Sequence, residues 1–350
     1  MAMGNRVRLI DIANKAGVSK MTVSLALRND PSISRETTNM IKEIADTLGY
    51  VPNRIAKGLV NGRTYTIAAI VGGDMHDDYH NQFLKGATDY AMGKGYTLTI
   101  ALTEGDKKLE TEIIRKYQEM GIDGYLVFHC GSSTNYKKMK EQGIPFVLYT
   151  KYFEDMDCDY VTCDDLKGGY DMTRYFLEQG HERIAYIYDK GLKNSSEVKN
   201  RCRGYQKAME ETSQGFEEIM VIPYDNSLDG RTVEEKNPEL MELLHSDKVP
   251  TAFFICNDVV AAAFLADMKS LGCRIPEDFS IAGYEGVYLG AVLDPPLTTM
   301  STPIRDMGKT ACELLIKKIE GKIQKNQISR ISMEPVLTIR KSVKRREELE

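Results

Sequence analysis

Residues Arg8 to Leu27 predict two short helices joined by a sharp turn, and this pattern constrains the fold more than any other in the chain. In the first half, apolar residues recur at the spacing of one helix face, at Leu9, Ile12, Ala13 and Ala16. Gly17 supplies the permissive backbone that a tight turn needs, so the first helix is expected to end there. Ser19 is a suitable N-cap for a second helix, which at about eight residues is too short to persist without packing on its neighbours. Its inner face would consist of Val23, Ala26 and Leu27.

Two helices in this arrangement are typical of a helix-turn-helix, whose second helix lies in the major groove of DNA. We expect the side chains of Lys20, Met21 and Leu25 to face base edges. Phosphate contacts, which position a protein on the duplex, are expected from Ser19, Thr22 and Asn29. Ser24 lies on the same outer face. The competing interpretation is a pair of packing helices in an unrelated domain.

Further patterns favour a complete DNA-binding domain. Ser34 can cap a third helix over residues 35–48, whose apolar face closes a small core with Met40, Ile41, Ile44, Ala45 and Leu48. Gly49 ends this helix, and a short helical stretch is predicted between Pro52 and Gly62. Residues 1–64 contain ten Lys and Arg against five Asp and Glu, a charge of +5, whereas the whole chain carries −5, which leaves −10 for the rest. A basic end on an acidic chain is expected of a module that binds DNA.

Taken together, these motifs resemble the DNA-binding headpiece and hinge of the LacI/GalR family of bacterial repressors. The resemblance rests on the AGVS and TVS motifs, the GYVPNRIA run and the NGRT exit within residues 8–64. It implies a hinge that folds into a helix when two subunits meet on an operator, with Leu59 wedged into the minor groove. The hinge contacts to DNA that it implies are Asn53, Arg54, Ala56, Lys57 and Leu59. Alternatively, Leu59 is a leucine that anchors a linker to the core.

Two departures from the family pattern bear on DNA binding. Many members have an arginine where this chain has Leu25, and an arginine can read guanine through O6 and N7. Leu25 cannot donate a hydrogen bond, so the corresponding base is either unread or contacted through an apolar surface such as a thymine methyl. Gly58 costs about 1 kcal/mol of helix stability relative to alanine, which favours a hinge that is disordered without DNA. A palindromic operator is still expected of a twofold dimer.

The chain after Thr64 is long enough for two lobes with cores of their own. Short apolar runs alternate there with amphipathic segments, an order that predicts parallel sheets covered by helices on both faces. The predicted strands are Thr66–Val71, Thr97–Leu102, Gly124–Phe128, Phe146–Leu148, Tyr160–Cys163, Ile184–Tyr188, Ile219–Ile222, Ala252–Cys256 and Ser280–Tyr284. The predicted helices include Gln82–Lys94, Lys108–Met120, Leu166–Gln179, Val198–Thr212, Pro238–Leu244 and Val259–Leu271.

The family resemblance extends over this larger part of the chain and implies a core similar to periplasmic sugar-binding receptors. It rests on the runs GHERIA at Gly180, RCRGY at Arg201, PTAFFICND at Pro250, RIPED at Arg274, IAGYE at Ile281 and PPLTTM at Pro295. The implied organisation is a DNA-binding domain over residues 1–51, a hinge over 52–64 and a core over 65–340. Three crossovers would join an N-lobe of residues 65–163 and about 293–325 to a C-lobe of about 164–292 and 326–340, with a final strand near Val336 to Ile339. Residues 341–350 would form a solvated, basic tail.

Ligands of open parallel sheets bind at the carboxyl ends of the strands. The cleft between the lobes is therefore expected to contain Asp74, Tyr79, His80, Thr150, Arg201, Asn257, Asp258 and Glu285. These residue types suit a polyhydroxylated ligand, because arginine is a fixed fork of donors, carboxylates accept from hydroxyls, and a tyrosine ring can stack on a sugar. Members of the family usually have an aspartate where this chain has Glu285, and they often have an aspartate near the position of Thr150. The pocket of this chain is therefore expected to differ in shape from theirs. The effector is expected to be a sugar or sugar derivative, although any of these residues taken singly could instead stabilise a lobe.

Other chemistry finds little support. His76 and His80 are spaced like metal ligands but lack a third ligand in sequence, so no metal or other cofactor is expected. Neither nucleotide-binding glycine motifs nor a G-x-S-x-G elbow is present, and an enzyme is not expected. The seven cysteines form no C-x-x-C pair and are expected to be reduced and mostly buried. No apolar run reaches 18 residues and the N-terminus has no apolar signal segment, so a soluble cytoplasmic protein is expected.

The resulting hypothesis is a homodimeric transcriptional repressor whose affinity for a palindromic operator is set by a small ligand between the lobes. A ligand receptor without a DNA-binding role is one alternative. A regulator of the catabolite-control type, with a protein corepressor docked on the N-lobe, is another, and activation in place of repression also stays open.

Overall fold

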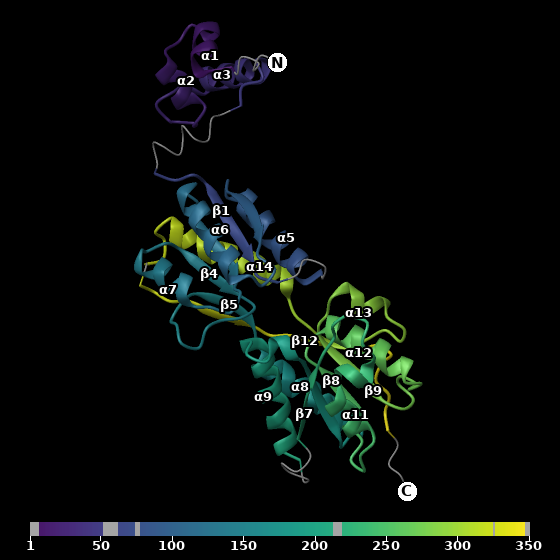
Figure 1. Cartoon of the computed structure of the whole chain (residues 1–350). Coiled ribbons are helices and arrows are strands. Elements are labelled where there is room, and N and C mark those ends of the chain that lie inside the picture. The colour runs from purple at the N-terminus through teal and green to yellow at the C-terminus, as the bar shows by residue number, and fades with distance from the viewer. Residues whose placement is uncertain (1–6, 52–61, 74–77, 213–218, 325, 347–350) are drawn as a thin grey trace. The chain divides into compact units, whose positions relative to one another are not determined.

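The computed structural model describes residues 7–51, 62–73, 78–212, 219–324 and 326–346. The chain divides into two compact units, Met1–Thr64 and Tyr65–Glu350. Figure 1 shows a small helical unit and a larger unit built on two sheets.

The first unit contains the expected three helices, α1 (Leu9–Ala16), α2 (Lys20–Ala26) and α3 (Arg35–Thr47). Gly17 ends α1 with φ of 65°, in the left-handed conformation that glycine adopts without strain. Ser19 and Ser34 cap the next two helices, since their hydroxyl oxygens accept from the amides of Thr22 and Thr37, both at 3.1 Å. The helices enclose a core of Ile12, Ala13, Val23, Ala26, Ile41 and Ala45.

The first lobe of the larger unit is a six-stranded parallel sheet. Its strands are β1 (Thr66–Val71), β2 (Thr97–Leu102), β3 (Gly124–Phe128), β4 (Phe146–Tyr149), β5 (Tyr160–Cys163) and β11 (Arg330–Met333), in the order β11-β5-β4-β3-β1-β2. Alternate residues of β1 face opposite sides, because side chains alternate along a strand. Ile67 packs with α5 (Asp78–Gly93) and α14 (Ile304–Ile319), while Ala68 packs with α6 (Lys107–Glu119) and α7 (Thr134–Glu141).

The second lobe is another six-stranded sheet, in the order β12-β10-β9-β8-β6-β7. Its strands are β6 (Ile184–Asp189), β7 (Met220–Tyr224), β8 (Ala252–Ile255), β9 (Ser280–Glu285), β10 (Thr298–Ser301) and β12 (Val336–Thr338). All pairs are parallel except β10 with β12. The helices of this lobe are α8 (Asp165–Glu178), α9 (Ser196–Glu210), α10 (Val233–Lys236), α11 (Pro238–Leu244), α12 (Asp258–Ser270) and α13 (Tyr288–Val292), with a 3₁₀ turn at Lys190–Leu192.

The chain passes between the two sheets three times, but two of the crossovers differ from the predicted positions. The first follows β5, as expected. The second lies between β10 and α14 and not near residue 293, because Thr298–Ser301 pairs with β9 of the second sheet. The third lies between β11 and β12 and not near residue 326, because Arg330–Met333 pairs with β5 of the first sheet. Both strands are short and half polar, so neither has the apolar run that marks a strand in a sequence.

The basic segment after β12 is not the solvated tail that its composition predicts. Ser342 is fully buried, and its hydroxyl donates to the Ile281 carbonyl and accepts from the Thr298 amide. His181 is also buried, with Nε2 3.0 Å from the Lys344 carbonyl oxygen and Nδ1 3.0 Å from the Thr251 hydroxyl. Backbone hydrogen bonds with Ile281 of β9, with Pro296 and with Gln179 at the end of α8 therefore dock residues 340–346 on the second lobe, although most of their side chains are charged.

This docking makes the stability of the second lobe sensitive to acid. Burial lowers the pKa of His181 to about 4, below the value of about 6.5 for an unfolded histidine. The unfolded chain thus binds the proton more readily, so the free energy of unfolding is expected to fall by about 2–3 kcal/mol as pH drops from 6.5 to 4. Urea denaturation at several pH values should show this slope, and His181→Gln should weaken it. The exposed His245→Gln is the control and should keep it.

Each lobe contains one helix pair in which glycines permit a close approach. A Cβ on Gly86 of α5 would lie 2.0 Å from the Arg305 carbonyl oxygen, and one on Gly308 of α14 would lie 2.0 Å from the Phe83 carbonyl oxygen. In the second lobe, a Cβ on Gly169 of α8 or Gly204 of α9 would meet a carbonyl oxygen of the facing helix at 2.1 or 2.2 Å. The recurrence of this device fits the expectation of two similar lobes.

Replacing Gly204 by alanine is expected to push α9 away from α8 and to destabilise the larger unit by about 1–3 kcal/mol. The matched control is Gly93→Ala at the end of α5, where a Cβ meets nothing within 4 Å. That variant should be neutral or slightly stabilising, because alanine favours the helix more than glycine does. Thermal denaturation of both variants checks the difference, and equal melting temperatures would contradict it.

All seven cysteines are free thiols, and four of them are buried. None of the helices in the described part of the chain has the length and apolar character that crossing a bilayer requires.

Candidate DNA-binding surface and effector site

The residues predicted to contact DNA lie outside the core of the first unit. Ser19, Lys20, Met21 and Asn29 are exposed, and Thr22, Ser24 and Leu25 are half buried. Met21 is 72% exposed, an unusual position for a large apolar side chain. The Ser19 and Thr22 hydroxyls lie 2.9 Å apart at the start of α2. The hinge residues Asn53, Arg54, Ala56, Lys57 and Leu59 fall outside the described residues, so their roles stay predictions.

Two basic residues that the sequence reasoning did not single out join this surface. Arg28 donates to the Ser24 hydroxyl at 2.6 Å and to the Ser24 carbonyl at 3.1 Å. Lys42 of α3 donates to the Asn29 side-chain oxygen at 2.6 Å. Both place positive charge beside residues expected to contact DNA. The spacing of four residues between Ser24 and Arg28 is the signal that could have identified the first pair.

In the larger unit, predicted effector residues from both lobes meet where the carboxyl ends of the two sheets face each other. Tyr79 of α5 is buried, and its hydroxyl lies 2.8 Å from that of Thr150, which follows β4. Burial and the Glu285 carboxylate of the second lobe raise the pKa of Tyr79 well above its usual value. We call this region the interlobe junction.

Two residues of the junction have strained backbones. Thr150 has φ of 67° and Glu285 has φ of 99°, a region that residues with side chains rarely occupy. They end the central strands β4 and β9, one in each lobe. Backbone strain of this kind concentrates at ligand and active sites, where the surrounding fold holds a side chain in place.

Arg201 is the centre of the junction on the side of the second lobe, and it is 1% exposed. Its Nε donates to Asp165 at 2.8 Å, and its Nη1 donates to the Cys256 carbonyl at 2.6 Å and lies 3.5 Å from Glu285. The guanidinium also lies 3.9 Å from the centre of the Tyr284 ring. In this conformation Nε and Nη1 of Arg201 are therefore engaged by the protein, and the weaker of these contacts reaches Glu285.

The sequence analysis did not predict Asp165 as a site residue. The rule that ligands bind at the carboxyl ends of strands could have identified it, because Asp165, like Asp258, follows a strand and begins a helix. Burial raises the pKa of Asp165 to about 6, against the opposing pull of Arg201. Asp258 is fully buried and accepts from the Val287 amide at 3.0 Å and from the Thr299 hydroxyl at 2.7 Å. It braces the loop after β9, so its carboxylate is engaged within the protein in this conformation, and its role as a ligand contact stays a prediction.

The remaining predicted residues differ in their surroundings. Asn257 is half buried, and its side-chain oxygen caps α12 by accepting from the Val260 amide at 2.8 Å. His80 is buried among aromatic rings, with the Phe128 ring centre 4.6 Å away. Asp74 and His76 lie outside the described residues. Among residues that are described, no group of three or more His, Cys, Asp or Glu side chains has a metal-binding arrangement.

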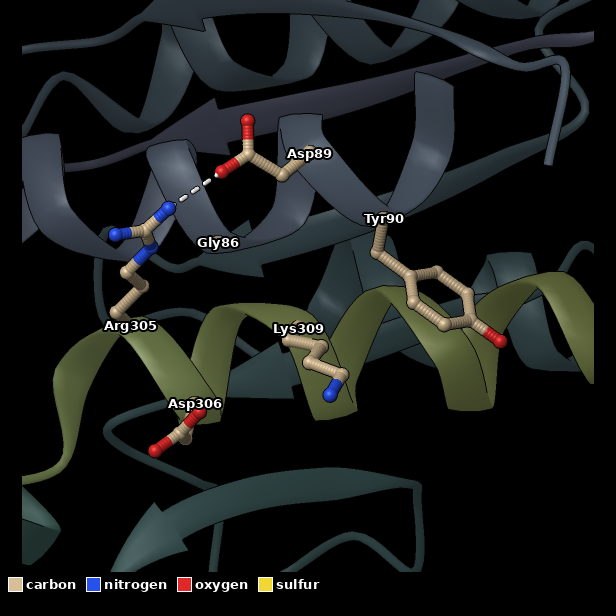
Figure 2. A pocket seen from close by; sticks show the side chains of 6 residues that line it. All are labelled: Gly86, Asp89, Tyr90, Arg305, Asp306 and Lys309. Atoms are coloured by element: carbon tan, nitrogen blue, oxygen red, sulfur yellow. Dashed lines mark hydrogen bonds and ion pairs between the residues drawn. The ribbon is translucent and has the colours of Figure 1, made fainter. Parts of the chain in front are cut away.

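A separate surface hollow of about 300 Å³ lies between α5 and α14 of the first lobe. Figure 2 shows Arg305 and Lys309 of α14 beside Asp89 and Tyr90 of α5. Arg305 donates to Asp89 at 2.7 Å across the two helices. Four exposed charged side chains, together with Gly86 and Tyr90, line this hollow, which is distinct from the interlobe junction.

A helix-turn-helix unit followed by a two-lobed α/β unit with a polar, strained junction defines the class of DNA-binding regulators that respond to ligands. Comparison with known proteins identifies the family within this class. The sequence profile described as "Bacterial regulatory proteins, lacI family" matches residues 8–53, and that described as "Periplasmic binding protein-like domain" matches residues 173–343. The chain is 30% identical over 336 residues to the HTH-type transcriptional repressor PurR of Photobacterium profundum, with 95% of this chain and 98% of the relative covered.

A second relative, the HTH-type transcriptional regulator DegA of Bacillus subtilis, is 30% identical over 342 residues, with 96% of this chain and 98% of the relative covered. The fold resembles that of a lac repressor dimer bound to operator, at a TM-score of 0.78 and 19% identity over 97% of this chain and all of that one. It also resembles the regulator CelR in complex with cellobiose, at a TM-score of 0.69 and 24% identity over 96% and 100% of the two chains. The chain belongs to the lacI family of bacterial regulatory proteins, and it is a DNA-binding transcriptional regulator.

Proposed function

We propose that the protein is a homodimeric repressor that binds a palindromic operator and responds to a small hydroxylated effector at the interlobe junction. The observation that carries the proposal is the combination of an exposed recognition helix with a second unit whose two lobes bring strained, charged and buried side chains together. An enzyme or a ligand receptor would not need the DNA-binding unit. A DNA-binding protein that does not respond to a ligand would not need the two-lobed unit.

For DNA, α2 would enter the major groove with Lys20, Met21 and Leu25 towards the bases. Ser19, Thr22, Asn29 and the missed Arg28 would hold the phosphates. Leu25 and Met21 are apolar, so we expect thymine methyl contacts in place of an arginine–guanine pair. Leu59 would supply the wedge in the minor groove once the hinge of each subunit has folded on the operator.

For the effector, Glu285 and Asn257 offer acceptors and donors at the strand ends, and Tyr79 borders them. Two relatives of known structure are described with sugars, the CelR complex with cellobiose and a regulator from Enterococcus faecium with ribose. They support a sugar or sugar derivative as the class of ligand. An inducing ligand must bind the DNA-free form more tightly than the operator-bound form, since coupling between two sites is reciprocal.

The proposed dimer is supported by apolar side chains left exposed in the larger unit. β2 is an edge strand of the first sheet, and its Ile100 and Leu102 are 46% and 42% exposed. Tyr288 and Val292 of α13 in the second lobe are 70% and 56% exposed. Exposed edges and clustered apolar residues of this kind are usually covered by a partner.

The test is selection of DNA fragments from a random pool at moderate salt, followed by gel-shift titration with candidate sugars. We expect a palindromic fragment whose affinity falls steeply with salt and falls again when an effector is added. Failure to select a palindrome would overturn the assignment of the first unit, and a receptor without a DNA-binding role would then be favoured. Failure of every sugar and sugar derivative to change operator binding would overturn the regulatory part.

A second candidate for regulation is a protein corepressor docked on the first lobe, favoured by the hollow between α5 and α14. Arg305, Asp306 and Lys309 are exposed there and could contact a partner protein (Figure 2). Lys309→Glu discriminates between the two candidates, because Lys309 lies outside the interlobe junction. It should abolish regulation by a protein partner in cell extracts and leave regulation by a sugar unchanged.

A further inference from the structure

Lys151 is a buried lysine whose ammonium forms no ion pair with the described residues of the first lobe. It directly follows the strained Thr150 at the end of β4 and is 8% exposed. Its Nζ lies 3.8 Å from the centre of the Phe128 ring. Within the described part of the chain, this ammonium makes no hydrogen bond and no ion pair within 4.0 Å.

The acid with the strongest electrostatic effect on Lys151 belongs to the other lobe. Glu197, in the first turn of α9, is 5% exposed, and its carboxylate has only a long contact of 3.4 Å with the Ser196 hydroxyl among the described residues. Glu197 influences Lys151 electrostatically but forms no ion pair with it. The two lobes are tied beside this pair, where the Tyr152 amide donates to the Ser196 hydroxyl at 3.0 Å.

The other acid near Lys151 is already committed to the protein. Glu110 is fully buried and accepts from the Cys130 amide at 2.8 Å and from the Asn135 side chain at 3.4 Å. Burial lowers the pKa of Lys151, as expected for an ammonium removed from water. A buried charge without a partner is costly, and the Phe128 ring offsets only part of that cost. A buried ammonium without an ion-pair partner is expected where a bound ligand supplies the negative charge.

We propose that Lys151 is the anion-binding residue of the effector site and that the effector is a hydroxylated acid with a single negative group. Its carboxylate would pair with Lys151, while hydroxyl groups would donate to Glu197 and Glu285. A ligand with several negative groups would be repelled by these two carboxylates, and a neutral sugar would leave the charge of Lys151 uncompensated. This inference rests on the proposed function, since it names the chemical class that the junction binds.

The proposal predicts an unusual response to mutation. Lys151→Met keeps a long unbranched side chain and removes the unpaired charge, so the ligand-free protein should become more stable. A structural role, in which Lys151 holds the lobes together through Glu197, would give the opposite sign. The control is Lys137→Met, because Lys137 pairs with Asp155 on the surface at 2.5 Å and lies outside the junction.

The experiment is thermal denaturation of the full-length protein with matched pairs of ligands, each a hexonate or hexuronate beside its parent aldose. We expect at least one acid to raise the melting temperature when its parent aldose at the same concentration does not. Lys151→Met should weaken binding of that acid at least tenfold, and Lys137→Met should leave it unchanged. Stabilisation by the aldoses alone, no stabilisation by any acid, or a lower melting temperature of ligand-free Lys151→Met would each overturn the proposal.

These outcomes are separable from failure of the proposed function. A neutral sugar that releases the operator in a gel shift would support that function and overturn the role of Lys151. Binding of an acid without selection of any palindromic DNA would support the role of Lys151 and overturn the proposed function.

Discussion

Replacing Arg201 by methionine is expected to destabilise the larger unit by about 3–5 kcal/mol. The loss arises because Arg201 is the partner of the buried Asp165 at 2.8 Å and also donates to the Cys256 carbonyl. Methionine fills a similar volume but leaves a buried carboxylate and a carbonyl oxygen without their donor. Urea denaturation followed by circular dichroism measures the effect.

The pH dependence of this variant gives an independent check. Burial already raises the pKa of Asp165 to about 6 in the presence of Arg201, and loss of Arg201 should raise it further. Asp165 then becomes neutral more easily, so the destabilisation should be larger at pH 8 than at pH 5. Combining Arg201→Met with Asp165→Asn should recover part of the stability. Arg203→Met is the control, since Arg203 is half exposed in its ion pair with Glu154 at 3.7 Å; equal stability of the Arg201 and Arg203 variants would contradict the prediction.

Replacing Ile41 by aspartate is expected to reduce operator affinity at least a hundredfold by unfolding the first unit. Ile41 is fully buried in a core that also contains Ile12, Val23 and Ala45. A unit of this size has little stability to lose, and a buried carboxylate without a partner costs several kcal/mol. Gel shifts with the selected palindrome measure the loss of affinity.

The same variant should leave the larger unit intact, because the chain divides into separate compact units at Thr64. Its main thermal transition and its response to effector should therefore match those of the wild type. Met40→Asp is the matched control, since the neighbouring Met40 is 40% exposed and a charge there should stay in water. Retention of operator binding by Ile41→Asp, or a lowered transition of the larger unit, would contradict the prediction.

Most of the fold could be predicted from local patterns. The turn at Gly17, the caps at Ser19 and Ser34 and the parallel strands from β1 to β9 are confirmed, because each depends on residues close together in the sequence. β10 and β11 were not predicted, and the lobe boundaries were therefore misplaced. These short strands are specified by the partners with which they pair, which lie far away in the chain.

The candidate site shows the same division. The rule that ligands bind at the carboxyl ends of parallel strands predicted one region for Tyr79, Thr150, Arg201 and Glu285. The structure brings these residues together at the interlobe junction. The rule could not assign their partners, because Arg201 meets Asp165 across 36 positions of sequence and Tyr79 meets Thr150 across 71. Asp258 follows the same rule, and the rule did not show that its buried carboxylate accepts from the loop after β9.

The sequence by itself determined the family, the helix-turn-helix and the alternation of strands and helices, because hydrophobic period, capping residues and turn glycines act over a few residues. Only the tertiary structure decided which polar side chains are satisfied within the protein and which keep an unused charge. Arg201 and Lys151 are both buried cations near the same strand ends, yet one has an acid within 2.8 Å and the other has an aromatic ring. Burial and pairing depend on distant segments that meet only on folding, so no local pattern carries this distinction.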